Sequence, residues 1–368
     1  MKNYLNFEIE IKDLETELDK LKDPYNQEGL SEIDTNKISQ IESEIDTKLN
    51  DIYSNLDPLQ KVLVARHKDR PKSEYYIKNL FEEFIPLSGD RFYGEDKSVL
   101  TGFAKFNETS VLVIGQEKGK DLESRIHRNF GMMRPEGYRK TIRLMKLADK
   151  FNIPIILFID TPGAYPGVGA EERGQAEAIA KSIECSMEIK VPTISIIIGE
   201  GGSGGAIALA SSNKVLMFEN AIYSVISPEG CATILWRDPT KTLEAATAMK
   251  LTAKDLLDLK VIDEIISEPV GGAQRDKDLT LNNTRSYIEN NLNEFSSMSR
   301  DEILNHRKNR FLSIGRSEGF TQQPSDIGNL SIKPDLISII KDKIIKSRKT
   351  TMLTIVILFF IFGIYYLL

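Results

Sequence analysis

Five glycines surround one serine between Ile198 and Ala210, where the chain reads I-G-E-G-G-S-G-G-A-I-A-L-A. An apolar, β-branched run precedes them and small residues follow, which predicts a buried strand, a tight turn and a closely packed helix. Glycines let main-chain N–H groups approach a ligand, and the start of a helix adds unpaired N–H groups and positive dipole charge. The pattern indicates an oxyanion hole, a set of donors for a negatively charged oxygen.

The same stretch also fits the nucleophile elbow of serine hydrolases. Residues 201–205, G-G-S-G-G, match G-x-S-x-G in the strand-to-helix context that this motif requires. A hydrolase also needs a histidine base within reach of Ser203. The chain has three histidines, of which His67 and His127 lie upstream and His306 lies in a polar stretch far downstream. A serine hydrolase that uses Ser203 is therefore an alternative hypothesis.

A second glycine-rich turn follows another apolar run. Pro154 to Asp160 reads P-I-I-L-F-I-D and predicts a buried strand, and Thr161 to Gly169 reads T-P-G-A-Y-P-G-V-G. We expect a helix from Glu171 to about Ile189 and the next strand from Pro192 to Ile198. Strand, helix and strand at this spacing predict a parallel crossover. Both glycine turns should therefore lie at one carboxyl edge of the sheet, where α/β sheets bind ligands.

Further elements of an α/β body surround these turns. The basic segment Arg125 to Gly137 is interpreted as a loop, either a solvated surface or a site for phosphate or carboxylate. The apolar runs at 99–106 and 110–115, separated by a short polar turn, predict a β-hairpin. We also expect helices at 75–84, 138–151, 228–236, 243–249, 253–259 and 286–310, and strands at 214–218 and 222–226, and the segment 261–266 closes the body.

Segments at both ends of the chain differ from this body. Apolar residues three and four apart at 11–21 and 38–56 predict two amphipathic helices. Pro24 lies between them, so we expect a helical hairpin that packs on its own body or on a partner. Residues 350–368 are almost wholly apolar and long enough for a candidate membrane-spanning helix, with basic residues before them that favour the cytoplasmic side. A helix buried against a partner is the alternative.

Composition narrows the class of protein. The 368 residues are 41% hydrophobic and 28% charged, as in a globular protein, and the net charge of -6 argues against general nucleic-acid binding. Two distant cysteines indicate neither a disulfide framework nor a metal cluster, and no signal peptide is visible. We therefore expect a cytoplasmic protein, tethered to the membrane if residues 350–368 insert. No Walker phosphate loop is present, so ATP binding in such a site is not expected.

Four long motifs resemble those of the alpha subunits of acetyl-coenzyme A carboxylase carboxyltransferases. They are G-Y-R-K at Gly137 to Lys140, I-D-T-P-G-A-Y-P-G-V-G-A-E-E-R-G-Q at Ile159 to Gln175, G-E-G-G-S-G-G-A at Gly199 to Ala206, and Y-S-V-I-S-P-E-G-C-A at Tyr223 to Ala232. The resemblance covers about Leu5 to Phe320. It implies a crotonase-like (ClpP/crotonase) α/β fold of repeated ββα units and an α2β2 heterotetramer with a separate beta subunit.

The resemblance also implies a reaction. In this family the carboxyl group moves from carboxybiotin on a biotin carboxyl carrier protein to acetyl-CoA, giving malonyl-CoA for fatty acid biosynthesis, and biotin carboxylase acts in the wider complex. By resemblance, the N–H groups of Gly204 and Gly205 form the oxyanion hole for biotin. The zinc motif belongs to the beta subunit, so no metal or permanent cofactor is expected here. The substrate pocket is expected to involve Gly201, Gly202, Ser203, Gly163, Ala164, Tyr165 and Gly167.

These features together divide the chain into five parts. We predict an N-terminal hairpin at 1–60, a carboxyltransferase body at 61–295, a C-terminal helix of the body at 296–319, a linker with a basic helix at 320–349, and the apolar segment at 350–368. A non-catalytic, membrane-tethered scaffold for fatty acid synthesis is a further alternative. It predicts partner binding without turnover.

Overall fold

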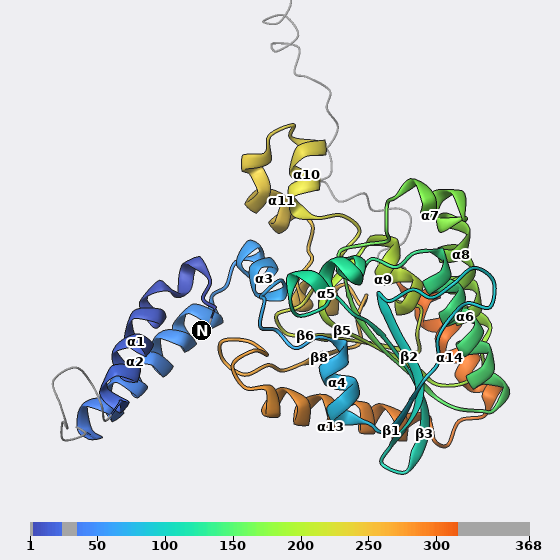
Figure 1. The fold of residues 1–368 in the computed structure, drawn as a ribbon, viewed down its shortest axis with the longest axis horizontal. Helices are drawn as coiled ribbons and strands as arrows, with labels where there is room; N and C mark the ends of the chain where they lie inside the picture. Colours follow the sequence, from blue (N-terminus) through green and yellow to red (C-terminus); the bar gives the residue numbers. More distant parts are fainter. Residues whose placement is uncertain (1–2, 24–34, 316–368) are drawn as a thin grey trace, which may run out of the picture. The chain divides into compact units, whose positions relative to one another are not determined.

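The computed structural model describes residues 3–23 and 35–315, and their centre is a mixed eight-stranded sheet (Figure 1). The strand order is β1-β2-β3-β4-β5-β6-β8, and β7 pairs with β5. The pairs β1–β2 and β2–β3 are antiparallel, whereas β3, β4, β5, β6 and β8 run parallel. The strands are β1 (Glu82–Pro86), β2 (Val99–Phe106), β3 (Thr109–Gln116), β4 (Ile155–Thr161), β5 (Thr193–Gly202), β6 (Lys214–Phe218), β7 (Ile222–Ser224) and β8 (Glu264–Ile266).

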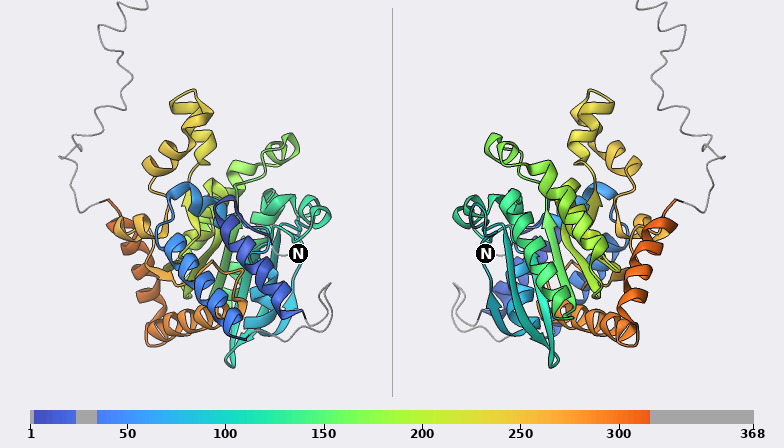
Figure 2. Two further views of the ribbon diagram at one scale, coloured as in Figure 1. Left: turned by 90° about the vertical axis from the view of Figure 1, so that its left-hand side faces the viewer. Right: turned by 90° about the vertical axis from the view of Figure 1, so that its right-hand side faces the viewer.

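The strands β4 and β5 lie in the interior of this sheet. Every residue of β4 is buried, and so is every residue of β5 except Gly202. Their continuous apolar runs fit strands covered by helices on both faces, as is usual in parallel sheets. The helices α6 (Pro135–Lys150), α8 (Gln175–Glu188) and α9 (Ser203–Ala210) cover one face, and α4 (Ser73–Leu80) and α13 (Lys277–Phe295) cover the other (Figures 1 and 2).

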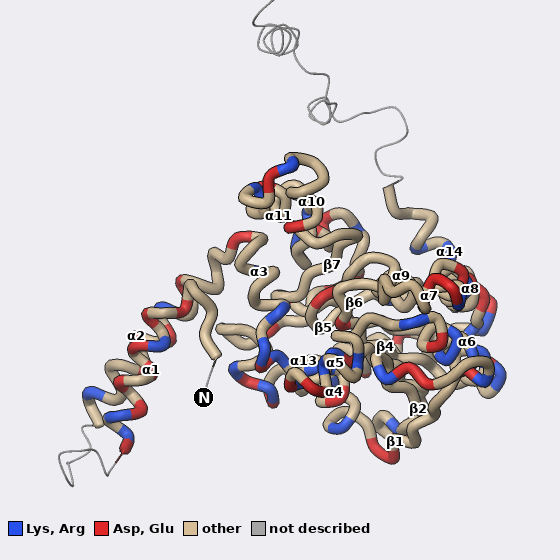
Figure 3. The backbone as a smooth tube through the Cα atoms, turned by 45° about the horizontal axis from the view of Figure 1, so that its top comes forward, with Lys and Arg blue, Asp and Glu red and all other residues tan. Residues whose placement is uncertain are grey.

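The predicted N-terminal hairpin is confirmed. It consists of α1 (Ile9–Lys22) and α2 (Thr35–Ser54), and its buried seam contains Ile11, Ile41 and Ile45. Basic and acidic residues are interspersed along both helices (Figure 3). The next helix, α3 (Pro58–Ala65), was not predicted, although Asp57 caps it and Pro58 occupies its first position.

The secondary structure predicted for two segments near the carboxyl ends of the strands is wrong. The helix expected from 171 to 189 is two helices, α7 (Val168–Glu172) and α8, because Gly174 between them has φ +81° and interrupts the helical backbone. The segment 125–137, expected to be a loop, is partly helical. It begins within α5 (Leu122–His127), which Asp121 caps, and continues through a 3₁₀ turn at Asn129–Gly131 into α6.

Two further helix predictions are too long. The helix expected at 75–84 ends at Leu80, and its last residues belong to β1. The polar helix expected at 286–310 is divided between α13 and α14 (Arg300–Ser313), because Ser299 starts a new helix with a capping box to Glu302. The remaining helices agree with their predicted positions to within a few residues: α10 (Pro228–Leu235), α11 (Thr242–Ala248) and α12 (Ala253–Asp258).

A fully buried cation helps to join the helix α14 to the body. Arg307 is fully buried, and its guanidinium donates to the carbonyl groups of Ser186, Ile189 and Val191 and to the side chain of Asn213. The described residues up to Ile314 group into one compact unit. The finer division at residues 60 and 295 stays a prediction.

The predicted linker, basic helix and membrane-spanning segment, 320–368, lie outside the described residues. Within the described ranges, no helix combines the length and the apolar character needed to cross a membrane.

Candidate active site at the glycine edge

The two glycine-rich turns meet at the carboxyl ends of β4 and β5, as the sequence predicts. Thr161 pairs with Gly201 across the two parallel strands. A Cβ atom on Gly202 would lie 2.2 Å from the carbonyl oxygen of Pro162, and one on Gly205 would lie 2.6 Å from the carbonyl carbon of Gly163. Side chains at these two positions would separate the turns. We call the two turns, Thr161–Tyr165 and Gly199–Gly205, the glycine edge.

The start of α9 supplies main-chain donors at this edge. The N-cap residue Gly202 provides no side-chain acceptor, so the N–H groups of Ser203, Gly204 and Gly205 have no partner within the helix. Gly204 is half-buried, and a Cβ atom there would be in ordinary contact, 3.5 Å from Ile179. These fixed donors, together with the helix dipole, can stabilise an oxygen that gains negative charge.

Two glutamines hold the glycine edge from the inside. The amide of Gln116, at the end of β3, donates to the carbonyl oxygen of Gly205 at 2.8 Å. The amide of Gln175, at the start of α8, donates to the carbonyl oxygen of Tyr165 at 3.0 Å and to that of Met133 at 2.8 Å. Both glutamines are buried, so the positions of the two turns are fixed from the core. The sequence reading did not identify either residue.

The predicted pocket residues of the second turn do not all face the donors. Gly163 and Ala164 lie against Gly205, where the donors are. Gly167 instead packs behind the ring of Tyr165, because a Cβ atom at Gly167 would lie 2.3 Å from that ring. The guanidinium of Arg134 stacks on the same ring at 4.7 Å. The structure therefore brings Gly163 and Ala164 to the donors and gives Gly167 a role in the packing of Tyr165.

Ser203 has an unusual backbone but no catalytic base. Its φ of +49° is in the left-handed region, which costs a residue with a side chain some conformational energy. No hydrogen bond joins its hydroxyl to a histidine among the described residues. The ring of His67 contacts the carbonyl oxygen of Asn3 and the ring of His306 contacts Asn213, so both rings have other partners. The third histidine, His127, is exposed at the end of α5. The hydrolase hypothesis therefore lacks the histidine that it requires.

A buried group of charges adjoins the glycine edge. This charge cluster consists of Lys118 after β3, Asp160 in β4 and Glu200 in β5. Lys118 Nζ lies 2.8 Å from Asp160 Oδ1 and also pairs with Glu200, whose N–H donates to Asp160 Oδ1 at 3.0 Å. A Cβ atom on Gly199 would lie 2.6 Å from that same oxygen. The cluster thus fixes the start of the glycine run against β4.

Electrostatic pairing keeps Glu200 and Lys118 ionised. Burial opposes the charged form of Glu200, but Lys118 and Arg66 outweigh it and lower the pKa of Glu200 to about 2. Burial also opposes the charge of Lys118, but Asp160 and Glu200 outweigh it and raise the pKa of Lys118. Arg66 donates to Glu200 at 2.6 Å and to Glu229 of α10 at 2.8 Å.

The charge cluster was not predicted from the sequence, although the sequence contains a signal for it. A charged residue stands at or just after the carboxyl end of each of the three apolar strand runs. Which of these charges meet depends on the register between the strands. Within the described residues, no group of three or more His, Cys, Asp or Glu side chains is arranged to hold a metal ion.

The free space beside the donors is small. A cavity of about 40 Å³ lies next to Gly201 and Gly202, between Arg66, Pro162 and Ser227. A volume of this size holds a few water molecules but no coenzyme. The cavity on this side of the glycine run is therefore too small for the whole of a coenzyme.

Comparison with known proteins identifies the family. Residues 4–315 match a family model described as acetyl co-enzyme A carboxylase carboxyltransferase-like. The chain belongs to this carboxyltransferase family. The family includes a Pelagibacter ubique (strain HTCC1062) protein named as the alpha subunit of acetyl-coenzyme A carboxylase carboxyl transferase, 75% identical over 348 residues, which cover 95% of each chain. The alpha subunit of Mesorhizobium japonicum is 54% identical over 318 residues, which are 86% of this chain and 100% of that relative.

Solved structures confirm the predicted fold of this carboxyltransferase family member. Transcarboxylase 12S, solved with methylmalonyl-coenzyme A and methylmalonic acid bound, matches with a TM-score of 0.52 and 19% identity, over 64% of this chain and 43% of that one. A second structure of transcarboxylase 12S, with hydrolysed methylmalonyl-coenzyme A, gives the same TM-score at 20% identity. At this identity the likeness shows the crotonase-like α/β fold alone.

Proposed function

We propose that this chain is the alpha subunit of a carboxyltransferase that moves the carboxyl group of carboxybiotin to acetyl-CoA and forms malonyl-CoA for fatty acid biosynthesis. The observation that carries the proposal is the glycine edge. Unpaired N–H groups of Gly204 and Gly205 stand there in a fixed turn, and a reaction that develops negative charge on an oxygen requires such donors. The family to which the chain belongs supports the same reaction.

The proposed chemistry uses the main chain rather than a nucleophilic side chain. When carboxybiotin releases CO₂, its ureido oxygen takes up negative charge, and the N–H groups of Gly204 and Gly205 donate to that oxygen. The biotin nitrogen then removes a proton from the acetyl methyl group, and the enolate carbon attacks the CO₂. Ser203 contributes its N–H group and a short side chain at the turn. Gly201, Gly202, Gly163, Ala164 and Tyr165 shape the biotin side of the pocket.

The small cavity favours an active site shared with another chain. Because only about 40 Å³ is enclosed beside Gly202, a second surface is needed to exclude water from the reaction. We propose that a separate, zinc-containing beta subunit supplies this surface and most of the acetyl-CoA contacts in an α2β2 assembly. Carboxybiotin would arrive on its carrier protein after biotin carboxylase has formed it.

The reverse reaction tests this proposal. Malonyl-CoA and free biotin are incubated with this chain alone, with a beta subunit alone, and with the co-purified complex, and the release of acetyl-CoA is measured. We expect activity in the complex and none in either chain alone. An inactive complex whose assembly and folding have been verified would contradict the proposed function, and activity of this chain alone would contradict the shared site.

A further inference from the structure

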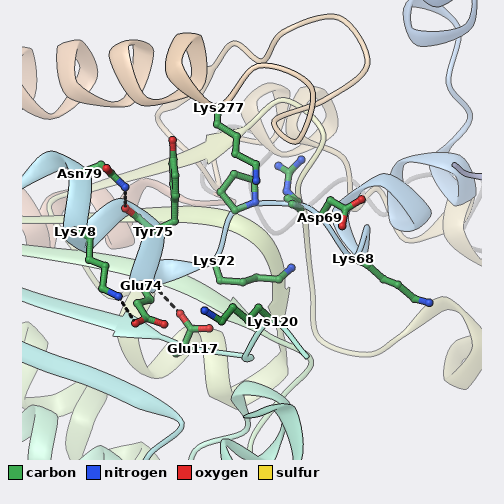
Figure 4. A pocket seen from close by; sticks show the side chains of 12 residues that line it. Lys68, Asp69, Lys72, Glu74, Tyr75, Lys78, Asn79, Glu117, Lys120 and Lys277 are labelled. Carbon is green, nitrogen blue, oxygen red and sulfur yellow. Dashed lines mark hydrogen bonds and ion pairs between the residues drawn. The ribbon is translucent and has the colours of Figure 1, made fainter. Parts of the chain in front are cut away.

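A cavity of about 400 Å³ lies on the α4 side of the molecule, apart from the glycine edge. We call it the lysine cavity, because Lys68, Lys72, Lys78, Lys120 and Lys277 line it. In Figure 4, Lys72 and Lys120 extend into its middle, and Lys277 reaches it from the start of α13. The volume is in the range of sites for small organic ligands.

One cation in the lysine cavity is buried without a hydrogen-bond partner. The side chain of Lys72 is 8% exposed, and its ammonium group has no acceptor among the described residues within hydrogen-bonding distance. Its nearest carboxylate oxygen is Asp160 Oδ2, at 3.9 Å. Asp160 already pairs with Lys118 at 2.8 Å. The nitrogen itself opens onto the cavity, so the oxygen atoms of a ligand bound there can accept from it.

The acidic side chains that line the lysine cavity form hydrogen bonds or ion pairs with groups other than Lys72 and Lys120. The carboxylate of Glu117 accepts hydrogen bonds from the N–H groups of Glu74 and Gly119, with both N···O distances at 2.7 Å. The carboxylate of Asp69 accepts hydrogen bonds from the side-chain amide of Asn3. Glu74 pairs with Lys78 at 2.7 Å. Within the described residues, none of these three acids forms an ion pair with Lys72 or Lys120.

Three further lysines add positive charge to the cavity without a close ion pair. Lys68, Lys120 and Lys277 are exposed, and none of them forms an ion pair within the described part of the chain. Lys277 Nζ instead lies 5.9 Å from the centre of the Tyr75 ring. This ring also borders the cavity and offers a flat apolar surface beside the cations.

We propose that the lysine cavity binds a nucleoside phosphate, with a phosphate group at Lys72 and Lys120 and the base against Tyr75. Phosphate oxygens would satisfy the ammonium group of Lys72, since charge-assisted hydrogen bonds are the strongest available to it. Two sources share this chemistry: the adenosine 3′,5′-bisphosphate end of coenzyme A, and a free nucleotide. The first source rests on the proposed function, whereas the site itself does not.

Calorimetric titration of the full-length chain tests the site without reference to activity. The probes are ADP, adenosine 3′,5′-bisphosphate, coenzyme A, inorganic phosphate and unphosphorylated adenosine. We expect the phosphorylated nucleosides to bind and adenosine to bind at least tenfold more weakly. Tight binding of coenzyme A and the bisphosphate over ADP would assign the site to the substrate, and the reverse order to a free nucleotide. Absence of binding by every phosphorylated nucleoside, or equal binding of adenosine, would overturn the proposal.

Variants locate the binding within the cavity. Lys72→Met should weaken the binding of the tightest probe at least tenfold, because it removes charge-assisted hydrogen bonds, and Lys72→Arg should restore most of it. Lys78→Met is the matched control, since Lys78 lines the same cavity but is 69% exposed and paired with Glu74, and we expect less than a threefold change. Lys120→Gln, an exposed change that leaves the core intact, should weaken binding about threefold or more. Unchanged affinity in both Lys72→Met and Lys120→Gln would refute the assignment.

Discussion

The glycine edge and the lysine cavity both attract negative charge, but they do so with different parts of the chain. At the glycine edge the donors are main-chain N–H groups, and the nearby charges, Lys118, Asp160 and Glu200, are paired with one another. In the lysine cavity the donors are side chains, and the ammonium of Lys72 is left without a hydrogen-bonded partner. Fixed dipoles suit a charge that appears only during a reaction, because they need little reorganisation. Unpaired cations suit a ligand that carries permanent charge.

The largest difference between the two regions should appear on removal of one cation from each. Lys118→Met removes the ammonium group that pairs with both Asp160 and Glu200 and leaves the two carboxylates buried. We therefore expect the free energy of unfolding to fall by about 3–5 kcal/mol. Urea denaturation followed by circular dichroism measures it. A loss below about 1 kcal/mol would mean that the charge cluster does not support the glycine edge.

A matched pair of glycine variants tests the donors themselves. Gly205→Ala places a Cβ atom 2.6 Å from Gly163 and should displace the turn, whereas Gly204→Ala has room and keeps its N–H group. We expect carboxyltransfer to fall at least about 100-fold in Gly205→Ala, as for the loss of an oxyanion-hole donor, and less than tenfold in Gly204→Ala. Reverse-reaction rates of the assembled complex provide the measurement. Equal losses of activity in both variants would contradict the proposal that the close approach of Gly205 to Gly163 positions the donors.

In the lysine cavity, the corresponding change should stabilise the protein. Burial, with repulsion from Lys118, Arg70 and Arg125, outweighs the attraction of Asp160 and lowers the pKa of Lys72 from its ordinary 10.5 to about 8. The charged form is therefore disfavoured in the folded state, so Lys72→Met should raise the free energy of unfolding at pH 7 by about 1–3 kcal/mol.

The pH dependence of that difference gives a second check on Lys72. Between pH 8 and 10.5 the unfolded chain binds more protons at this residue than the folded chain, so the wild type gains stability as the pH rises. The advantage of Lys72→Met should shrink across this window. If the stability difference between Lys72→Met and the wild type stays constant from pH 7 to pH 10, burial does not lower the pKa of Lys72.

The smallest effect is expected at Ser203. Because its φ is +49°, Ser203→Gly should stabilise the turn by about 1 kcal/mol and Ser203→Ala should be close to neutral. Both variants keep the N–H group, so carboxyltransfer should stay within a few-fold of the wild type. Thermal unfolding and the reverse reaction measure the two quantities. A loss of more than 100-fold in Ser203→Ala would revive a chemical role for the hydroxyl.

Apolar runs were sufficient to predict the strands β4 and β5 and the meeting of their turns, since parallel neighbours bring their carboxyl ends to one edge. The N-terminal hairpin was equally predictable from its spacing of apolar residues. Long, regular patterns of this kind depend only on local sequence. The family resemblance added the crotonase-like fold, which the periodicity of the chain did not specify.

Contacts between distant segments were not predictable in the same way. Lys118, Asp160 and Glu200 are each one charge beside an apolar run, and only the register of three strands brings them within hydrogen-bonding distance. The lysine cavity likewise joins Lys72 and Lys277, which are far apart in sequence. The break at Gly174 was more accessible, because a glycine inside a helical pattern is a warning of a helix end.

The pairing of β5 on both sides has a consequence for the exchange of amide hydrogens with solvent. Gly201 is in register with Thr161 of β4 and with Tyr223 of β7, so this part of the glycine run is held within the sheet. Three to four residues later, Gly204 and Gly205 carry N–H groups without a helical acceptor. The glycine edge should therefore place a protected ladder segment directly beside two unprotected amides. An oxyanion bound there would slow the hydrogen exchange of those two amides and leave the exchange rates of the ladder segment unchanged. Hydrogen exchange would therefore detect binding at this site specifically.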